Sequence, residues 1–179
     1  MQTSKYLLAT DRDAQWGLTV STVGKENIEP GEDYPTKGHA DGYYFDIKKG
    51  RTLDEYQLLY QSEGEGVFQS EHCPETTIKA GDIFMLFPGE WHTYHPNREK
   101  GWKSFWIGFK GKNIDDRVKH GFLSVEKPIY HVGFSNEIIN LYEEHIAPPS
   151  RRLPSRNRAW LVSSTTSSDS CTPWKETSN

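Results

Sequence analysis

Hydrophobic and polar residues alternate through most of the first 110 positions, in short runs separated by glycine and proline. A two-residue period is typical of β-strands that bury one face. Repeated at this spacing, it predicts an all-β barrel or sandwich. The expected strands are 16–23, 43–47, 55–61, 66–70, 76–78, 83–87, 92–95 and 103–109. The segment from Gly64 to Gly66 is expected to form a hairpin turn between two of them.

The hydrophobic period lengthens to that of a helix after residue 109. Ile114 and Val118, with Phe122 as a third candidate, fall on one face of a first helix. Ser135 is placed to cap a second helix. The apolar stripe of this second helix consists of Ile138, Ile139, Leu141, Tyr142 and Ile146. Such a stripe packs on its own barrel or pairs with a partner, and the pattern alone favours neither.

Residues 147–179 differ in composition from everything before them. Four arginines and a Ser/Thr run at 163–168 are accompanied by few aliphatic residues and no periodicity. The hydrophobic fraction of the whole chain, 34%, is also low for 179 residues. We therefore expect a folded domain at 1–146 and a low-complexity tail at 147–179 that is disordered or frameshifted. The alternative is a nucleic-acid-binding tail, which the lack of interleaved aromatic residues disfavours.

Residues 79–94 contain the most informative pattern in the chain. They combine a turn, an apolar strand, a tight turn at Pro88 and Gly89, and a second strand with His92 and Tyr94 on one face. This pattern resembles the second signature motif of cupin barrels. The resemblance implies a histidine at the mouth of a small β-barrel, where it holds a metal or hydrogen-bonds a ligand.

The residues upstream of this motif argue against a metal. Metal-binding cupins place two histidines and a carboxylate there, whereas this chain has Arg51, Leu53 and Gln57 at those positions. A guanidinium, an alkyl group and an amide do not replace two imidazoles and a carboxylate. His95 does not help, because an offset of three on a strand puts it on the face opposite His92. We expect no metal and no other cofactor, with His92 as a neutral histidine of the pocket.

Composition narrows the range of partners. A net charge of −4 and a pI near 6.0 argue against binding of a phosphate backbone by this chain itself. The absence of a long apolar run and of a signal peptide after Met1 predicts a cytoplasmic protein with no membrane partner. Cys73 and Cys171 are expected to be reduced thiols rather than a disulfide.

The stretch from about Tyr6 to Ile146 resembles the amino-terminal sensing and dimerisation domain of AraC-type transcriptional regulators. The resemblance rests on Glu55–Tyr60, Glu63–Gly66, Lys79–Asp82, Phe87–His92 and Gly101–Phe109. It implies a barrel that binds a small effector, often a sugar, and helices that pair two subunits. In that family a carboxy-terminal domain with two helix-turn-helix units reads DNA. Only 33 residues (179 minus 146) follow Ile146, so we expect DNA binding only through a domain absent from this chain.

The strand after Gly101 provides the candidate pocket wall. Alternation puts Trp102, Ser104 and Trp106 on one face of this strand. Indole faces beside hydroxyl and imidazole groups suit a sugar, although core packing remains the alternative for both tryptophans. The resemblance places Trp106 at the stacking tryptophan of the family's arabinose sensor. It also implies a sugar-contacting basic residue just before the long strand, either Lys48 or Arg51, and the fixed donor fork of arginine favours Arg51.

The sequence therefore predicts the effector-binding and dimerisation domain of a bacterial AraC-type transcription regulator, without enzymatic activity. The predicted ligand-binding residues are Trp106, His92, Tyr94, Arg51, Ser104, Lys48 and Trp102. The predicted homodimer contacts are Ile138, Leu141, Tyr142 and Ile146. The alternative is a metal-dependent cupin enzyme, such as a sugar isomerase or dioxygenase. It would require Glu90, Glu55 or His92 to act in a role that their spacing does not suggest.

Overall fold

A computed structural model describes residues 2–35 and 46–146. The elements in chain order are β1 (Gln2–Tyr6), α1 (Asp11–Ala14), β2 (Thr19–Ile28), β3 (Tyr56–Ser70), β4 (Thr76–Lys79), β5 (Asp82–Leu86), β6 (His92–Pro96), β7 (Trp102–Lys110), α2 (Lys112–Lys119), β8 (Ile129–His131) and α3 (Asn136–Ile146). All strand pairs are antiparallel. The predicted mainly β, cupin-like class followed by two helices is confirmed. The predicted domain boundary and the tail at 147–179 lie outside the described residues.

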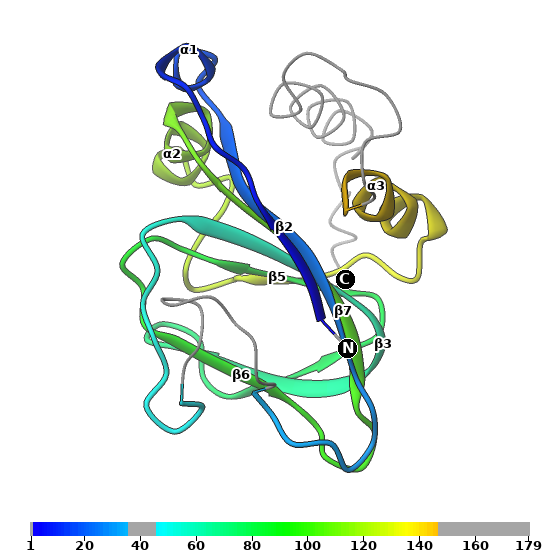
Figure 1. Ribbon diagram of the computed structural model, residues 1–179. Coiled ribbons are helices and arrows are strands. Elements are labelled where there is room, and N and C mark those ends of the chain that lie inside the picture. Colours follow the sequence, from blue (N-terminus) through cyan, green and yellow to red (C-terminus); the bar gives the residue numbers. More distant parts are fainter. Residues whose placement is uncertain (1, 36–45, 147–179) are drawn as a thin grey trace, which may run out of the picture.

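The long strand β3 belongs to both layers of the fold (Figure 1). Its first part, Tyr56 to Gly64, pairs with β7, and the stretch 57–60 also pairs with β5. Its last part pairs with β4 and β6. The hairpin predicted at Gly64 to Gly66 is therefore wrong, because the strand continues through it. Gly64 has a φ of 80°, and a Cβ there would lie 2.7 Å from the Cα of Trp102, so the glycine permits a close crossing where β3 changes layers.

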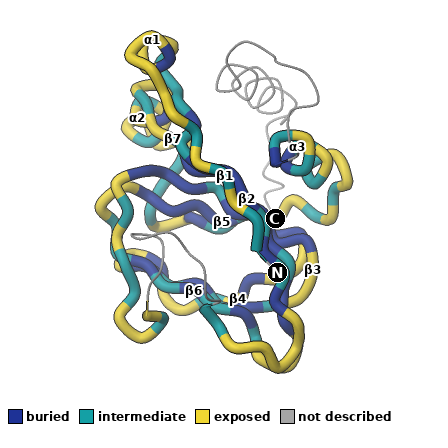
Figure 2. Tube along the Cα trace, in the orientation of Figure 1, coloured by how far each residue is buried: buried dark blue, intermediate teal, exposed yellow. Residues whose placement is uncertain are grey.

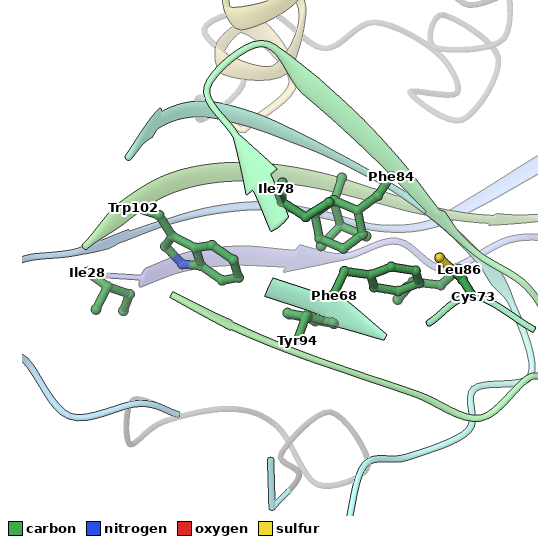
Figure 3. Close-up of a cluster of buried hydrophobic side chains, with 9 residues drawn as sticks. Ile28, Phe68, Cys73, Ile78, Phe84, Leu86, Tyr94 and Trp102 are labelled. Carbon is green, nitrogen blue, oxygen red and sulfur yellow. The ribbon is translucent and has the colours of Figure 1, made fainter. Parts of the chain in front are cut away.

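Aromatic and aliphatic side chains fill the space between the layers (Figure 3). Phe84 is at the centre, with ring centroids 5.1 Å from Phe68 and 5.6 Å from Tyr94. The remaining buried members are Ile28, Leu59, Cys73, Ile78, Leu86 and Trp102. Cys73 is a free thiol, as predicted, whereas Cys171 lies outside the described residues. This core holds β2, β3, β6 and β7 in fixed positions, and the candidate site is built on these strands.

Helix α3 covers the outer face of β1, β2 and β7. Ser135 caps it as predicted, because the Ile138 amide donates to the Ser135 hydroxyl at 3.2 Å. Tyr142 and Ile146 are only 4% and 5% exposed, and they pack with Val23 and Phe105. These two residues therefore belong to the core of their own domain rather than to a dimer contact. Ile138 and Ile139 are partly buried and pack against the same cluster, whereas Leu141 is partly buried but lies outside it.

The other helices and the short strands depart from the expected pattern in detail. Helix α2 buries Ile114 as predicted, but Phe122 follows the helix and is 76% exposed. The hydrophobic pattern does not predict β1, α1 or β8, and the strand expected at 43–47 lies mostly outside the described residues. Figure 2 shows α1 and the connecting loops exposed and most strand residues of the two layers buried. None of the helices in the described part of the chain is long and apolar enough to cross a membrane.

Candidate functional site

A small cavity of ≈ 30 Å³ lies between β1, β2, β3 and β7. Aromatic and polar side chains alternate around it, with few aliphatic groups. They are Gln2, Ser4 and Tyr6 of β1, Thr22 and Glu26 of β2, Gln57 and Leu59 of β3, Ser104 and Trp106 of β7, and Tyr34, Arg51 and Tyr94. A cavity of this size has room for about two water molecules.

The structure brings four of the seven predicted ligand-binding residues to this cavity. Trp106, Ser104, Tyr94 and Arg51 all line it. His92 is hydrogen-bonded to Arg51 but is not among the lining residues. Arg51 therefore stands between the imidazole and the cavity.

Trp102 and Lys48 do not reach the cavity. Trp102 is 2% exposed and packs in the interior core against Tyr34 and Tyr94. It shares a strand face with Trp106, but it lies at the start of β7, within the core cluster between the layers. Lys48 is exposed in a turn, where its amide donates to the Asp46 carboxylate at 2.9 Å. Of the two basic candidates, only Arg51 is therefore positioned to contact a ligand.

Gly24 determines where the Trp106 indole lies. The two residues are directly paired across β2 and β7. A Cβ on Gly24 would lie 2.6 Å from Cε2 of the indole and 2.7 Å from the main-chain oxygen of Thr3, closer than real Cβ atoms come. The missing side chain thus lets the indole lie directly on the backbone of β2. The result is an aromatic surface held at one wall of the cavity.

Replacing Gly24 with alanine is expected to displace this indole. Overpacking of this kind typically costs about 1–3 kcal/mol of stability. Urea denaturation of Gly24→Ala, Trp106→Ala and the double variant measures the coupling between the two positions. We expect the alanine at position 24 to cost less when Trp106 is absent. An equal cost in both backgrounds would assign the clash to Thr3 and β1 instead.

Arg51 links the histidine of the predicted motif to the cavity. Its Nε donates to Nε2 of His92 at 3.3 Å, and its Nη2 donates to the Tyr94 hydroxyl at 2.7 Å. The other His92 nitrogen, Nδ1, lies 3.1 Å from the main-chain oxygen of Glu90, which can only accept. Nδ1 therefore carries the proton, and Nε2 is the acceptor for Arg51. Burial, together with the nearby guanidinium, lowers the pKa of His92 to about 4, so the imidazole is neutral at physiological pH.

These contacts do not fit the metal that a cupin barrel can hold. The His92 nitrogen that would face a metal accepts a hydrogen bond from a permanently charged guanidinium. Gln57 offers a neutral amide, whose nitrogen donates to Glu55 at 3.0 Å. Leu53 offers no donor atom. The positive charge of Arg51 stands where the ligands of a cation would have to converge, so the arrangement disfavours a second cation.

A separate surface group brings possible metal ligands together. Among the described residues, Glu71, His72 and Glu90 have ligand atoms within 4.8 Å of one another. His72 Nδ1 lies 2.9 and 3.0 Å from the two Glu90 oxygens, and this hydrogen bond raises the pKa of His72. Glu90 does not line the cavity. The group is thus explained as a surface ion pair, and Glu90 is not placed to act on a ligand there.

Sequence reasoning missed several lining residues, most clearly Glu26 and Thr22. Both are buried, at 4% and 2% exposure, on the interior face of β2. The predicted strand ends at residue 23, which leaves Glu26 in a predicted loop, whereas β2 continues to Ile28. Continued alternation through Thr22, Gly24, Glu26 and Ile28 is the signal that could have identified them. Tyr34 also falls in a predicted loop, yet it packs, partly buried, against the core and is hydrogen-bonded to Tyr94, and desolvation raises its pKa.

Comparison with known proteins points to one family. Residues 34–142 match the AraC-like ligand binding domain family. The chain is 35% identical over 83 residues to the raffinose operon transcriptional regulatory protein RafR of Pediococcus pentosaceus. It is 28% identical over 94 residues to the MmsAB operon regulatory protein of Pseudomonas aeruginosa. These matches cover 46% and 51% of this chain but only 30% of each relative.

Solved structures show weaker likeness. The protein YhaK of Escherichia coli is 12% identical with a TM-score of 0.44, covering 62% of this chain and 45% of that one. A cupin-like protein of Thermotoga maritima is 18% identical with a TM-score of 0.37, covering 79% of this chain and 84% of that one.

Proposed function

The chain belongs to the AraC-like ligand binding domain family, and we propose that it is the sensor domain of a bacterial transcription regulator whose effector is a carbohydrate. The observation that supports a carbohydrate most is the Trp106 indole, which lies on Gly24 at the wall of a cavity lined by polar groups. The C–H faces of a sugar ring stack on such an aromatic surface, while its hydroxyls need directed hydrogen bonds.

The charges at the cavity favour a neutral polyhydroxy compound. Glu26 is a buried carboxylate that disfavours an anionic ligand, and Arg51 disfavours a cationic one. Carboxylate oxygens accept hydrogen bonds and guanidinium nitrogens donate them, whereas the Gln57 amide and the Ser104 hydroxyl can do both. A sugar presents hydroxyls that satisfy both kinds of partner. The name of the Pediococcus relative refers to a raffinose operon, which makes raffinose and its component sugars the first compounds to test.

The small volume of the cavity implies that binding changes the positions of the lining side chains. Sites for small ligands commonly enclose about 300 Å³ or more, whereas this cavity encloses ≈ 30 Å³. A sugar ring therefore requires the lining side chains to move apart. Because Trp106 is one of them, the fluorescence of its indole should report on binding directly.

Assembly and cellular role are further parts of the proposal. We propose that two copies pair through the part of α3 that faces away from its own barrel, with Leu141 as its apolar member and the edge of Ile138, which also packs on the barrel, beside it. We further propose that the regulator to which this domain belongs binds DNA and is located in the cytoplasm. An enzymatic role has less support, because the relatives are regulators and the candidate catalytic groups are engaged. Glu55 accepts from Ser21 and Gln57, and His92 accepts from Arg51.

Titration with L-arabinose, D-galactose, melibiose and raffinose tests the carbohydrate proposal. We expect at least one of these sugars to change tryptophan fluorescence with saturable, modest affinity, since hydroxyls give up good hydrogen bonds to water. The Trp106→Ala variant should bind that sugar about 1–3 kcal/mol more weakly by calorimetry while remaining folded. Trp16→Ala is the matched control, because Trp16 is 54% exposed and does not line the cavity. Equal affinity of wild type and Trp106→Ala would place the site elsewhere.

A further inference from the structure

One buried hydroxyl at the cavity has no partner within the described part of the chain. Oγ1 of Thr22 is inaccessible to solvent and accepts or donates no hydrogen bond there. The residue is 2% exposed, lies on the interior face of β2 and lines the cavity. Burying a hydroxyl without a hydrogen bond is unfavourable, and native structures rarely retain such a group without a use or an ordered water.

The polar groups nearest to Thr22 are bonded to other residues. The Glu55 carboxylate is 2% exposed and is held by the Ser21 hydroxyl and by Nε2 of Gln57. The facing residue on β7 is Gly108, and a Cβ there would overlap both Oγ1 of Thr22 and Oε1 of Glu55. Glycine at 108 thus lets the two oxygens converge, but it offers no side chain of its own to bond them. Of these residues only Thr22 and Gln57 line the cavity, and the Thr22 hydroxyl forms a polar floor there that no described residue hydrogen-bonds.

We propose that Thr22 is a specificity-determining contact and that the effector reaches this floor with a hydroxyl group that hydrogen-bonds Oγ1. The inference rests on the proposed carbohydrate function. It identifies the part of the cavity that would distinguish one sugar from another. A site with an unpartnered buried polar group discriminates strongly against compounds that lack the matching group, because the protein group then stays unpaired. Trp106 would stack on the sugar ring without distinguishing its hydroxyls, whereas Thr22 would select for one of them.

Two substitutions separate this role from a structural one. Thr22→Val keeps the shape and removes the hydroxyl, and Thr22→Ser keeps the hydroxyl. Without sugar, we expect Thr22→Val to be at least as stable as wild type in urea, since it removes an unpaired buried group. With L-arabinose, D-galactose, melibiose or raffinose, whichever binds wild type, we expect Thr22→Val to bind about tenfold more weakly. Thr22→Ser should bind within about threefold of wild type, because the hydroxyl is retained.

Stability and affinity each have a result that would overturn the proposal. A Thr22→Val protein that is clearly less stable than wild type without sugar would do so, because the hydroxyl would then already be satisfied, for example by a structural water. Unchanged sugar affinity in Thr22→Val would overturn it as well. If none of the four sugars binds wild type, the carbohydrate proposal fails, and the stability comparison alone then decides whether Thr22 is free to contact a ligand of another kind.

Discussion

Lowering the pH from 6.5 to 4 is expected to remove about 3 kcal/mol of folding free energy through His92 alone. The pKa of this histidine is lowered from 6.5 to about 4 in the folded protein, first by burial and then by the charge of Arg51. The unfolded chain therefore takes up a proton as the pH falls through 6.5, while the folded state does not. The stabilising effect of neutral His92 is complete above pH 6.5 and declines towards pH 4. Below that it is fully lost.

Urea denaturation at pH 7, 5.5 and 4 measures this effect. Other groups also titrate in this range, so the informative quantity is the difference between wild type and His92→Gln. The glutamine keeps an acceptor for Arg51 but cannot be protonated. We expect the variant to be less stable at pH 7 and to lose less stability on acidification. If the free energy of unfolding changed with pH by the same amount in both proteins, the imidazole of His92 would not be held neutral in the folded state.

The second large effect is expected in helix α3. Tyr142→Ala should cost about 3–5 kcal/mol of stability, the usual loss for a large aromatic side chain removed from a core. Tyr142 is 4% exposed, its ring centroid lies 5.5 Å from that of Phe105, and its hydroxyl donates to the main-chain oxygen of Leu58 at 3.3 Å. Leu141, the preceding residue, is partly buried and is not part of the cluster that contains Tyr142. Its replacement by alanine should cost less than about 1.5 kcal/mol.

The dependence of stability on protein concentration shows whether Tyr142 packs within its own domain or lies in a dimer contact. If Tyr142 packs only on its own domain, its contribution to stability is the same at low and high protein concentration. If it lies in a dimer contact, the loss grows with concentration, because association adds to apparent stability. Thermal denaturation at two protein concentrations a hundredfold apart tests this, and a strongly concentration-dependent loss for Tyr142→Ala would contradict the structure. Sedimentation of Leu141→Asp tests the proposed pairing surface separately.

Local patterns were sufficient to predict β6, β7 and the two longer helices. Alternation put His92 and Tyr94 on one face, and their rings do stack, with centroids 6.2 Å apart. The same rule put Ser104 and Trp106 on the cavity face of β7. The course of β3 could not be predicted this way. A pair of glycines is typical of a hairpin, and only the other layer, which receives the second half of the strand, shows that the chain continues.

Contacts between distant segments explain most of the remaining differences. Arg51 and His92 meet through an isolated β-bridge across 41 positions, so their hydrogen bond is a property of the tertiary fold. Strand β1 has a polar sequence and gains its place by pairing with β2 at the edge of the sheet. The hydrophobic pattern therefore could not predict that β1 contributes residues to the cavity. The apolar stripe of α3 could be identified from the sequence, but its orientation depends on Val23 and Phe105 of the sheet beneath it.

The central claim is that this domain binds a carbohydrate without a metal, because Arg51 occupies the position of a metal ligand. Calorimetric titration of one protein sample, divided into a metal-free and a metal-supplied portion, tests this claim most directly. One portion is treated with a chelator, and the other is supplied with zinc, manganese or ferrous iron before titration with the sugar that wild type binds best among the four. Because His92 accepts its hydrogen bond from Arg51 rather than coordinating a cation, we predict the same affinity and stoichiometry in both portions. Binding that disappears after chelation and returns with added metal would contradict a metal-free sensor.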